Sequence, residues 1–343
     1  MESAMDMRNA IVTITGGTGS FGSTMVKHLL DKEVAQIRIF SRDETKQDEM
    51  RRRLNDSRVS FHLGDVRDRE SVNQVMRGTN FVFHAAALKQ VPSCEFFPDQ
   101  ATQTNVLGSR NVIESAAQHS VESVVCLSTD KAVYPINVMG MTKALMEKFA
   151  QGFVRNDSGS STRVSVTRYG NVMCSRGSVI PVFARQITSG KPITITNPNM
   201  TRFLMSLSDS VDLVDYAFLQ ANPGDILVKK SPACTVATLA NAVAEALGYD
   251  APDIQIIGTR HAEKLHETLL SSEEVRVAVD EGDYFRSPLD TRSLDYDLYF
   301  STGDADSVNR AAYDSFVTNQ LSVEEAKTLL LANREFSALM NGL

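Results

Sequence analysis

One short stretch of the chain carries side chains that can move protons. Residues 129–143, TDKAVYPINVMGMTK, open with an adjacent acid and base, Asp130 and Lys131, and end at Lys143. Met139 stands four residues before Lys143, so the two share one face of a helix. A thioether can neither give nor take a proton. The stretch therefore offers an acid–base pair and a second lysine, with no phenol one helical turn before that lysine.

A glycine-rich turn lies near the start of the chain, in IVTITGGTGSFGSTMVKHLL. Glycines between a strand and a helix allow backbone N–H groups and the helix N-terminus to approach a pyrophosphate. Because this turn follows the first apolar run of an alternating pattern, it predicts a dinucleotide site. We expect six residues of the turn to contact the cofactor: Gly16, Thr18, Gly19, Ser20, Phe21 and Gly22.

The second strand ends in FSRDETKQ, which bears on the choice between NAD and NADP. An acidic residue at this tip binds the ribose 2′-OH of NAD. Here Ser41 and Arg42 occupy the tip, and Lys46 follows closely. A guanidinium suits a 2′-phosphate, so the sequence favours NADP, while Asp43 leaves NAD as the alternative.

Apolar runs alternate with amphipathic stretches over the first two thirds of the chain. AIVTITG, QIRIFS, VSFHLGD, FVFHAAA, VVCLSTD and VSVTRYG predict buried strands. STMVKHLLDKE, RESVNQVM and VLGSRNVIESAAQHS predict helices between them. This alternation predicts an α/β fold with a doubly wound parallel sheet of the Rossmann type.

Shorter strands and helices follow, which predicts a smaller, interleaved α/β substrate domain. We assign residues 1–172 to the nucleotide-binding domain. Residues 173–202 and 231–343 are assigned to the substrate domain and a C-terminal helical segment. The stretch 203–230 contains SLSDSVDLVDYAFLQA and DILVKK, and we expect it to return to the first domain.

The overall composition argues against several classes of function. A net charge of -7 and a pI near 5.5 argue against nucleic acid or an anionic membrane as the main partner. Cys94, Cys126, Cys174 and Cys234 lack metal-ligand spacing, so we expect free thiols and no metal site. No signal-peptide core and no run of about 18 apolar residues occurs, which predicts a cytoplasmic protein without a membrane partner.

Longer motifs carry a resemblance to a known family. TGGTGSFG, HAAALKQVP, STDKA and RYGNV resemble the extended short-chain dehydrogenase/reductase superfamily. FSRDETKQ, STDKAVYP, SRGSVIPVF and GTRHAEKLHE are similar to motifs of bacterial UDP-N-acetylglucosamine 4,6-dehydratases. Met139 and the later DYFRSPLDTR resemble a C5-inverting capsule and O-antigen branch of that family, on the route to N-acetyl-L-fucosamine.

This resemblance implies roles for the proton-moving residues. It makes Asp130 the acid for the C6 hydroxyl of the sugar and Lys131 the base at C5, which requires a raised Asp pKa and a lowered Lys pKa. A surface ion pair is the alternative interpretation. The resemblance places Lys143 on the nicotinamide ribose, and it implies an NADP that is tightly bound and recycled within the reaction.

Without a tyrosine at position 139, another group must accept the proton of the C4 hydroxyl. The candidates are Lys143, a water molecule, Thr129 and Tyr134, of which we favour Lys143 or water. Pro135 prevents Tyr134 from sitting on the same helical turn as Lys143. Met139 either shapes the pocket wall near C4 or is an ordinary apolar helix residue.

The remaining candidate residues follow from strand ends and from the resemblance. Beyond the glycine turn, we expect these at the cofactor: Ser41, Arg42, Lys46, Asp65, Val66, Ala85, Ala86, Ala87, Lys89, Asn105, Lys143, Tyr169 and Asn171. The resemblance implies these at the UDP-sugar: Lys89, Asn171, Arg176, Val179, Thr201, Arg202, Met205, Arg260 and Glu263. Asp65 equally suits a helix N-cap, and Tyr169 is expected to pack beneath the cofactor. The family commonly has glycine where Ala262 stands.

The leading interpretation is a lyase, an NADP-dependent 4,6-dehydratase of UDP-N-acetylglucosamine that inverts C5. The alternatives are a UDP-N-acetylhexosamine 4-epimerase and a non-catalytic NADP-binding scaffold protein. The Asp130–Lys131 pair argues against an epimerase, because epimerisation at C4 needs no acid for a leaving C6 hydroxyl. We expect UDP-N-acetylglucosamine as the ligand and a homo-oligomer, with a hexamer as one form.

Overall fold

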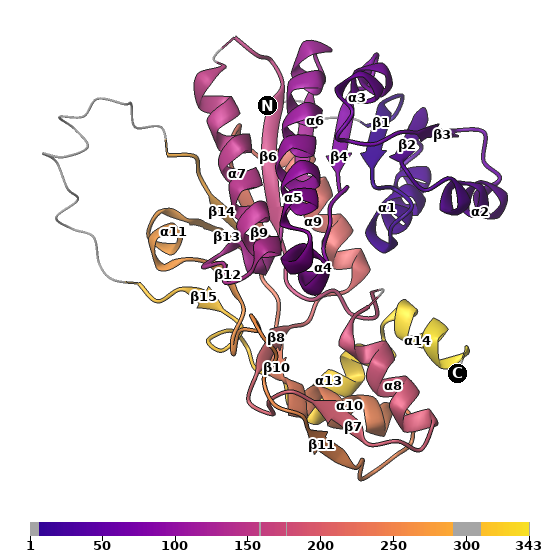
Figure 1. The fold of residues 1–343 in the computed structure, drawn as a ribbon, viewed down its shortest axis with the longest axis vertical. Coiled ribbons are helices and arrows are strands. Elements are labelled where there is room, and N and C mark those ends of the chain that lie inside the picture. Colours follow the sequence, from indigo (N-terminus) through magenta and orange to yellow (C-terminus); the bar gives the residue numbers. More distant parts are fainter. Residues whose placement is uncertain (1–6, 158, 176, 291–309, 343) are drawn as a thin grey trace, which may run out of the picture.

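A mostly parallel sheet forms the centre of the molecule (Figure 1). The computed structural model describes residues 7–157, 159–175, 177–290 and 310–342. Seven strands run parallel in the order β3 (Val59–Leu63), β2 (Gln36–Ser41), β1 (Ile11–Thr15), β4 (Phe81–His84), β5 (Ser123–Leu127), β6 (Arg163–Arg168) and β9 (Ile226–Lys229). The strand order reverses beside β1, which is the doubly wound arrangement. The predicted fold class is therefore confirmed.

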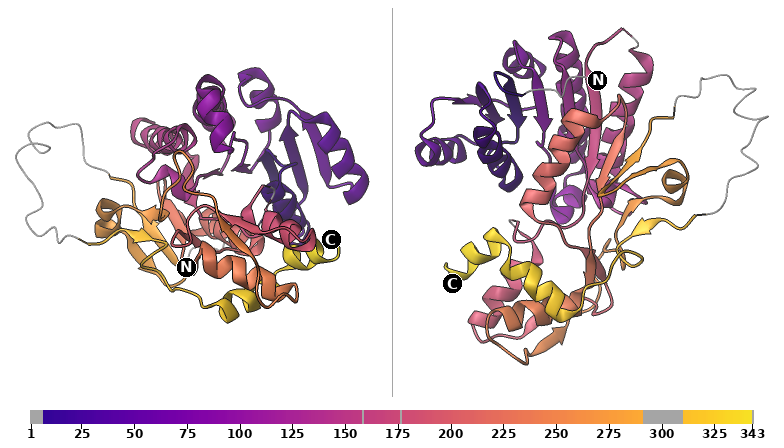
Figure 2. Two further views of the ribbon diagram at one scale, coloured as in Figure 1. Left: turned by 60° about the horizontal axis from the view of Figure 1, so that its bottom comes forward. Right: turned by 180° about the vertical axis from the view of Figure 1, so that it is seen from behind.

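Helices cover both faces of this sheet, as its buried apolar strands require. One face carries α3 (Arg69–Met76), α6 (Gly108–Gln118) and α7 (Val138–Asn156), whose apolar sides share a core with β4, β5 and β6. The other face carries α1 (Ser20–Asp31), α2 (Glu44–Leu54) and α9 (Leu207–Gln220). Figure 2 shows α9 lying across the back of the sheet. Each predicted strand of the first two thirds is present.

The chain between β4 and α6 is less regular than the sequence predicts. It forms α4 (Val91–Phe96), α5 (Pro98–Ala101) and a π-helix, η1 (Thr102–Leu107), so the helix expected over 106–120 is α6 preceded by a wider turn. π-helical turns often occur at functional sites. This one carries Asn105, one of the candidate cofactor residues.

After one helix and two short strands between residues 179 and 203, the chain returns to the large sheet. Ser206 and Asp209 form a capping box that starts α9, and β9 then pairs with β6. Still later, β14 (Tyr284–Ser287) pairs antiparallel with β9, and β13 (Val279–Glu281) pairs with β14. Part of 231–343 thus lies on the large sheet; the domain boundaries drawn from the sequence stay a prediction.

A second, smaller unit lies below the sheet in Figure 1. It contains α8 (Val179–Thr188), β7 (Ile193–Ile195), β8 (Thr201–Phe203), β10 (Ala233–Thr235), α10 (Val236–Ala246), β11 (Ile254–Ile256), α13 (Val323–Leu331) and α14 (Arg334–Met340). Its helices share an apolar core of their own. Between the two units lie β12 (Thr268–Leu270), α11 (Ser272–Val277) and β15 (Tyr313–Asp314).

A buried ion cluster joins the sheet to this intermediate segment. Arg168, at the end of β6, donates to both carboxylate oxygens of Glu147 on α7, at 2.8 and 2.6 Å. It also donates to both carboxylate oxygens of Glu274 on α11, at 2.7 and 2.8 Å. Burial alone lowers the pKa of Arg168, but the two glutamates outweigh it and raise that pKa. The guanidinium therefore stays charged and holds α11 against the sheet.

Replacement of Arg168 with Met should strongly destabilise the protein, because two carboxylates would lose their cation inside the protein. Breaking a buried pair in this way costs about 3–5 kcal/mol. Chemical denaturation followed by circular dichroism measures the loss. Arg52→Met is the control, since the Arg52–Asp48 pair is exposed and such pairs contribute about 0–1 kcal/mol. Equal denaturation midpoints for the two variants would contradict the assignment.

Candidate functional site

The glycine turn has the shape of a ligand cradle that side chains would fill. Gly16 has φ of +69°, and a Cβ there would lie 2.8 Å from the Cα of Ala86. A Cβ on Gly22 would lie 2.5 Å from the Cα of Gly17. Gly19 occupies the N-cap of α1, so no side chain covers this helix N-terminus. Side chains at Gly16 and Gly22 would therefore clash with the backbone, and the bare backbone of the turn fits a dinucleotide pyrophosphate.

A chain of contacts connects this turn to the proton-moving residues. The ring of Phe21 stacks on Tyr169, with centroids 5.4 Å apart and planes 5° from parallel. The carbonyl of Tyr169 accepts a hydrogen bond from the N–H of Asp130, at 3.2 Å. Burial raises the pKa of the Tyr169 phenol well above its usual value, so this group does not fit the role of a base.

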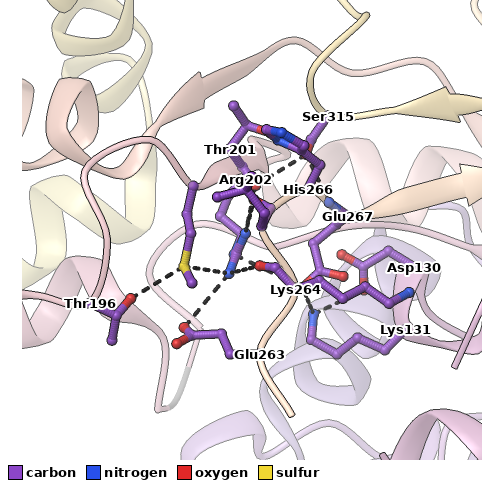
Figure 3. A network of polar contacts seen from close by, with 12 residues as sticks. Asp130, Lys131, Thr196, Thr201, Arg202, Glu263, Lys264, His266, Glu267 and Ser315 are labelled. Carbon is purple, nitrogen blue, oxygen red and sulfur yellow. Dashed lines mark hydrogen bonds and ion pairs between the residues drawn. The ribbon is translucent and has the colours of Figure 1, made fainter. Parts of the chain in front are cut away.

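Asp130 and Lys131 lie in a short 3₁₀ turn, η2 (Asp130–Ala132), directly after β5 (Figure 3). Lys131 Nζ donates to Asp130 Oδ1 at 3.1 Å and lies 3.3 Å from Glu267 Oε1. The Asp130 side chain is 1% exposed and that of Glu267 is 3% exposed. The surface ion pair is therefore excluded, because both carboxylates that contact Lys131 are buried.

Two oxygens of this cluster are left without protein partners. Asp130 Oδ2 and Glu267 Oε2 are buried, and no hydrogen-bond partner for either exists among the residues that the structure describes. A buried acceptor without a partner costs about 1–3 kcal/mol. Such oxygens are suited to a ligand hydroxyl, which would supply the missing hydrogen bond.

The lowered pKa expected for Lys131 is wrong for the structure as it stands. Burial by itself lowers the pKa of Lys131, but the carboxylates of Asp130 and Glu267 together outweigh burial and raise it. The sequence expectation considered burial and one acid, whereas the fold supplies two. Lys131 therefore carries a proton at neutral pH in this state.

Arg202 is used within the protein. Its Nη atoms donate to the carbonyls of Thr201 at 2.7 Å, Lys264 at 3.0 Å and Leu265 at 3.2 Å, and the residue is 9% exposed. Its Nη2 lies 3.6 Å from Glu263 Oε1. Arg202 thus holds the GTRHAEKLHE segment against β8, which accounts for its burial without a diphosphate.

Among the other candidate substrate residues, Thr201, Met205 and Val179 are buried or partly buried, and Arg260 is exposed. Thr201 and Met205 are 2% and 1% exposed, and the Thr201 hydroxyl bonds His266 and Ser315. Arg260 is exposed, and its N–H donates to Glu263 at 3.2 Å. Val179 begins α8 and packs on the core of the smaller unit.

Asn171 presents another buried acceptor close to these groups. No partner for its Oδ1 exists in the described part of the chain, which fits a ligand contact. Ala262 has φ of +56°, the left-handed region that favours glycine, and its carbonyl accepts from Asn137 at 3.3 Å. Arg176 lies outside the described residues.

Lys143 is a buried amine at the end of β5. Its Nζ donates to the carbonyl of Leu127 at 2.7 Å. Burial lowers the pKa of Lys143 to about 8, against the raising influence of Cys126, Glu147 and Cys94. A lysine with this pKa exchanges its proton near neutral pH, as a general base requires.

Met139 and Tyr134 lie in surroundings that argue against proton transfer. Met139 is 5% exposed and packs in an apolar cluster with Cys94 and Ala101, which favours the interpretation as an ordinary helix residue. Tyr134 is 48% exposed, and its hydroxyl bonds Ser272 and Glu273 at the N-terminus of α11. The Thr129 hydroxyl donates to Asp130 Oδ1 at 2.7 Å.

The loop after β4 is fixed by Asn105. Its amide donates to the Leu88 carbonyl and the Thr142 hydroxyl, both at 3.0 Å, and accepts from the Leu88 N–H at 2.8 Å. Asn105 therefore shapes the loop that holds Ala85, Ala86, Ala87 and the exposed Lys89. His84 at the end of β4 has its pKa lowered to about 3 by burial, with Lys143 also contributing, so it is neutral.

Directly after β2, the side chain of Arg42 is exposed and open to a phosphate. It is 56% exposed, and its Nη1 lies 3.8 Å from Asp65 Oδ2. Lys46 pairs with Asp43, the residue that caps α2, which makes Lys46 a weaker candidate. Ser41 is held by Gln47, and Asp65 bonds Arg67. Val66 is buried against Gly108.

Sequence reasoning missed Glu267. Glu267 ends the segment GTRHAEKLHE, in which the sequence pointed only to Arg260 and Glu263. The signal was present, because a carboxylate directly before an apolar strand, TLL, is a candidate for burial at a strand end. Among the described residues no helix is long and apolar enough to cross a membrane, and no cluster of His, Cys, Asp or Glu could hold a metal.

Two family models match the chain. The model described as "Polysaccharide biosynthesis protein" matches residues 12–288, and that described as "Polysaccharide biosynthesis protein C-terminal" matches residues 290–335. A protein of Rickettsia rickettsii (strain Sheila Smith) named "UDP-glucose 4-epimerase" is 54% identical over 322 residues, which cover 93% of this chain and 94% of that protein.

Two solved structures are similar to this chain over most of its length. Pen from Bacillus thuringiensis has a TM-score of 0.86 and 31% identity, and the match covers 95% of this chain and 99% of that one. DesIV, a dTDP-glucose 4,6-dehydratase from Streptomyces venezuelae with NAD and TYD bound, has a TM-score of 0.67 and 20% identity, over 74% of this chain and 86% of that one. The second likeness shows the shared fold.

Removal of the Arg42 side chain should weaken NADP binding more than NAD binding, because only NADP carries the 2′-phosphate. Loss of one charge-assisted contact should reduce NADP affinity roughly tenfold or more. Isothermal titration of the cofactor-free protein with each dinucleotide measures the change. Arg52→Ala, an exposed arginine on α2, is the control. An equal loss for both dinucleotides in Arg42→Ala would contradict the assignment.

Proposed function

Because this chain belongs to the polysaccharide biosynthesis protein family, a group of extended short-chain nucleotide-sugar dehydratases and epimerases, we propose that it dehydrates UDP-N-acetylglucosamine across C4, C5 and C6. The proposed product is a UDP-2-acetamido-2,6-dideoxy-4-hexulose with inverted C5. Such a sugar is a precursor for capsule or O-antigen units of the N-acetyl-L-fucosamine type.

The observation that carries this proposal is the buried Asp130–Lys131 pair with its unpartnered carboxylate oxygen. Elimination of the C6 hydroxyl needs a base at C5 and an acid at the departing oxygen, within one sugar's width. Asp130 and Lys131 contact each other at 3.1 Å, so one ring can meet both. Asp130 Oδ2 is a buried acceptor that a C6 hydroxyl would satisfy.

Because its pKa is raised, Lys131 begins the reaction protonated and must lose that proton before it can act as a base. When a sugar excludes water from this cluster, the cost of keeping two charges buried rises. Transfer of one proton from Lys131 Nζ to the Asp130 carboxylate, to be carried on Oδ2 toward the sugar, then produces a neutral amine and a neutral carboxylic acid. The amine takes the C5 proton, and the acid gives its proton to the C6 oxygen, which leaves as water. This elimination restores the ion pair. Addition of a hydride at C6 and of a proton at C5 then completes the 4-ketone, so that the sugar has lost one water overall.

Lys143 is the proposed acceptor for the C4 hydroxyl proton. Its pKa of about 8 allows a substantial neutral fraction near neutral pH, which the absent phenol would otherwise provide. In this proposal the C4 hydroxyl proton passes to Lys143 either directly or through one water molecule. Met139 is assigned no proton transfer, since it packs among apolar residues.

The residues present fit NADP. The bare glycine turn would hold the pyrophosphate, Arg42 the 2′-phosphate, and Lys143 the nicotinamide ribose. When bound, the nicotinamide supplies reversible hydride acceptance, which makes the C5 proton acidic. Asn171, Arg260 and Glu263 are the proposed contacts for the nucleotide and sugar.

A UDP-hexose 4-epimerase is the second candidate, because a relative that is 54% identical carries that name. Epimerisation at C4 would leave the acid Asp130 without a task. A non-catalytic scaffold would leave the entire Asp130–Lys131–Glu267 cluster without a task. We therefore favour the dehydratase, and we propose that it acts as a homo-oligomer.

Incubation with UDP-N-acetylglucosamine in deuterated water, followed by proton NMR, should reveal a C6 methyl group and loss of the C6 hydroxyl. Coupling constants at C5 report inversion. Lys131→Ala should form no such product, because no base remains at C5. Lys230→Ala, which removes an exposed ion pair with Asp280, should behave as the wild type. A C4 epimer alone would select the epimerase, and unchanged sugar would select the scaffold.

Dehydration should accelerate as the pH rises from about 7 to 9. Burial lowers the pKa of Lys143 to about 8, so its neutral, proton-accepting form is scarce below that pH and dominant above it. Among its neighbours, burial lowers the pKa of His84 to about 3 and raises the pKa of Cys126 to about 12, both outside this window. Initial rates at saturating sugar measure the profile. A rate that is flat between pH 7 and 9 would contradict the role of Lys143.

A further inference from the structure

We propose that Glu267 is a positioning residue that holds Lys131 beside Asp130 and links both to Arg202. This inference rests on the proposed dehydratase function, because it assigns Glu267 to the base of that reaction. Glu267 acts through Lys131, and this role does not depend on any contact of its free oxygen with the sugar.

Tertiary contacts fix Glu267 in this position. It stands directly before β12, which packs against the η2 turn of Lys131. Its N–H donates to the Ser315 hydroxyl at 2.9 Å, and its carbonyl accepts from the Ser315 N–H at 2.8 Å. The residue is 2% exposed. Both backbone groups are used, so the carboxylate is directed at Lys131 from a fixed backbone.

The charges around Lys131 come from three segments. Asp130 lies on its own turn, Arg202 on β8, and Lys264 and Glu267 on the segment before β12. Glu267 Oε1 lies 3.3 Å from Lys131 Nζ and 3.9 Å from Arg202 Nε. One carboxylate thus faces two cations. Together with Asp130 it balances the two positive charges, and it fixes where the Lys131 amine lies.

Comparison with the Arg168 cluster separates this arrangement from a purely structural ion pair. Arg168 makes four contacts of 2.6–2.8 Å to Glu147 and Glu274. Each of the four carboxylate oxygens accepts one of these hydrogen bonds. The contacts of Glu267 are longer, and its Oε2 has no partner in the described part of the chain. A buried charge pair is by itself weak evidence for a stabilising role. Its geometry suits an amine that must gain and lose a proton.

The position of Glu267 also meets a requirement of the proposed proton cycle. After Lys131 passes its proton to Asp130, the attraction that held the amine to Asp130 weakens. Glu267 Oε1 still accepts a hydrogen bond from the neutral amine, so the amine stays in place while it takes the C5 proton. Arg202 Nε, 3.9 Å from the same oxygen, keeps a cation beside the Glu267 carboxylate during this step.

The first test measures Lys131 without any reaction. Full-length protein labelled with ¹³C at lysine Cε is titrated by NMR, and Lys131→Ala assigns the Lys131 signal. In Glu267→Gln the Lys131 signal should titrate at a clearly lower pH than in the wild type, because one negative charge is gone. Glu245→Gln removes the carboxylate partner of Lys327 in the smaller unit, so its Lys131 signal should titrate as in the wild type.

The second test measures the reaction. Glu267→Gln should reduce kcat of dehydration at least about tenfold, with a much smaller change in KM, because the base is misplaced and the sugar contacts are intact. Glu267→Asp keeps the charge on a shorter side chain. It should lower kcat while leaving the Lys131 titration close to that of the wild type, and thermal unfolding verifies that both variants fold.

The two tests distinguish the two proposals. If the wild type forms no dehydrated sugar, the proposed function fails, and the Lys131 titration still decides whether Glu267 governs that amine. If Glu267→Gln titrates as the wild type and keeps its kcat within about twofold, the role of Glu267 is overturned. A Glu267→Asp variant with full kcat would show that placement by this side chain is not needed.

Discussion

The buried guanidinium of Arg168 is the contact on which the site depends. It binds α7 through Glu147 and α11 through Glu274 at the end of β6. Helix α7 carries Lys143, and α11 follows directly after β12 and Glu267. The Arg168 guanidinium therefore helps to place two groups: the buried amine of Lys143 and the carboxylate of Glu267, which faces Lys131. Without it, α11 would lose the ion pairs that tie it to α7 and to the end of β6.

Two buried charge clusters of different character lie within this small region. The Arg168 cluster is fully paired, and its bidentate geometry leaves little freedom. The cluster of Asp130, Lys131 and Glu267 contains two carboxylates for one amine and has buried oxygens without protein partners. A protein keeps such costly groups where a ligand or a proton can complete them. The first cluster therefore accounts for stability, and the second is where chemistry is proposed.

The absence of a phenol at position 139 changes one part of the site and leaves the other intact. Met139 fills an apolar cluster beside α4, and its neighbour one turn later, Lys143, is buried enough to titrate near pH 8. In a site with a tyrosine, a lysine of this kind assists the phenol. Here we propose that the lowered pKa allows the lysine to take the proton itself. The elimination half, at Asp130 and Lys131, contains no residue that depends on a phenol.

The sequence alone determined the sheet, the glycine turn and the position of Asp130–Lys131 at a strand end, because these follow from local periodicity and from glycine sterics. Tertiary structure decided the rest. It brought Glu267 to Lys131, which reversed the expected direction of the Lys131 pKa, and it committed Arg202 to carbonyls of the 264–265 segment. It also turned the Tyr134 hydroxyl toward α11. The reason is physical: a pKa and a hydrogen-bond partner depend on whichever groups the fold brings within a few ångströms, and these come from distant parts of the chain.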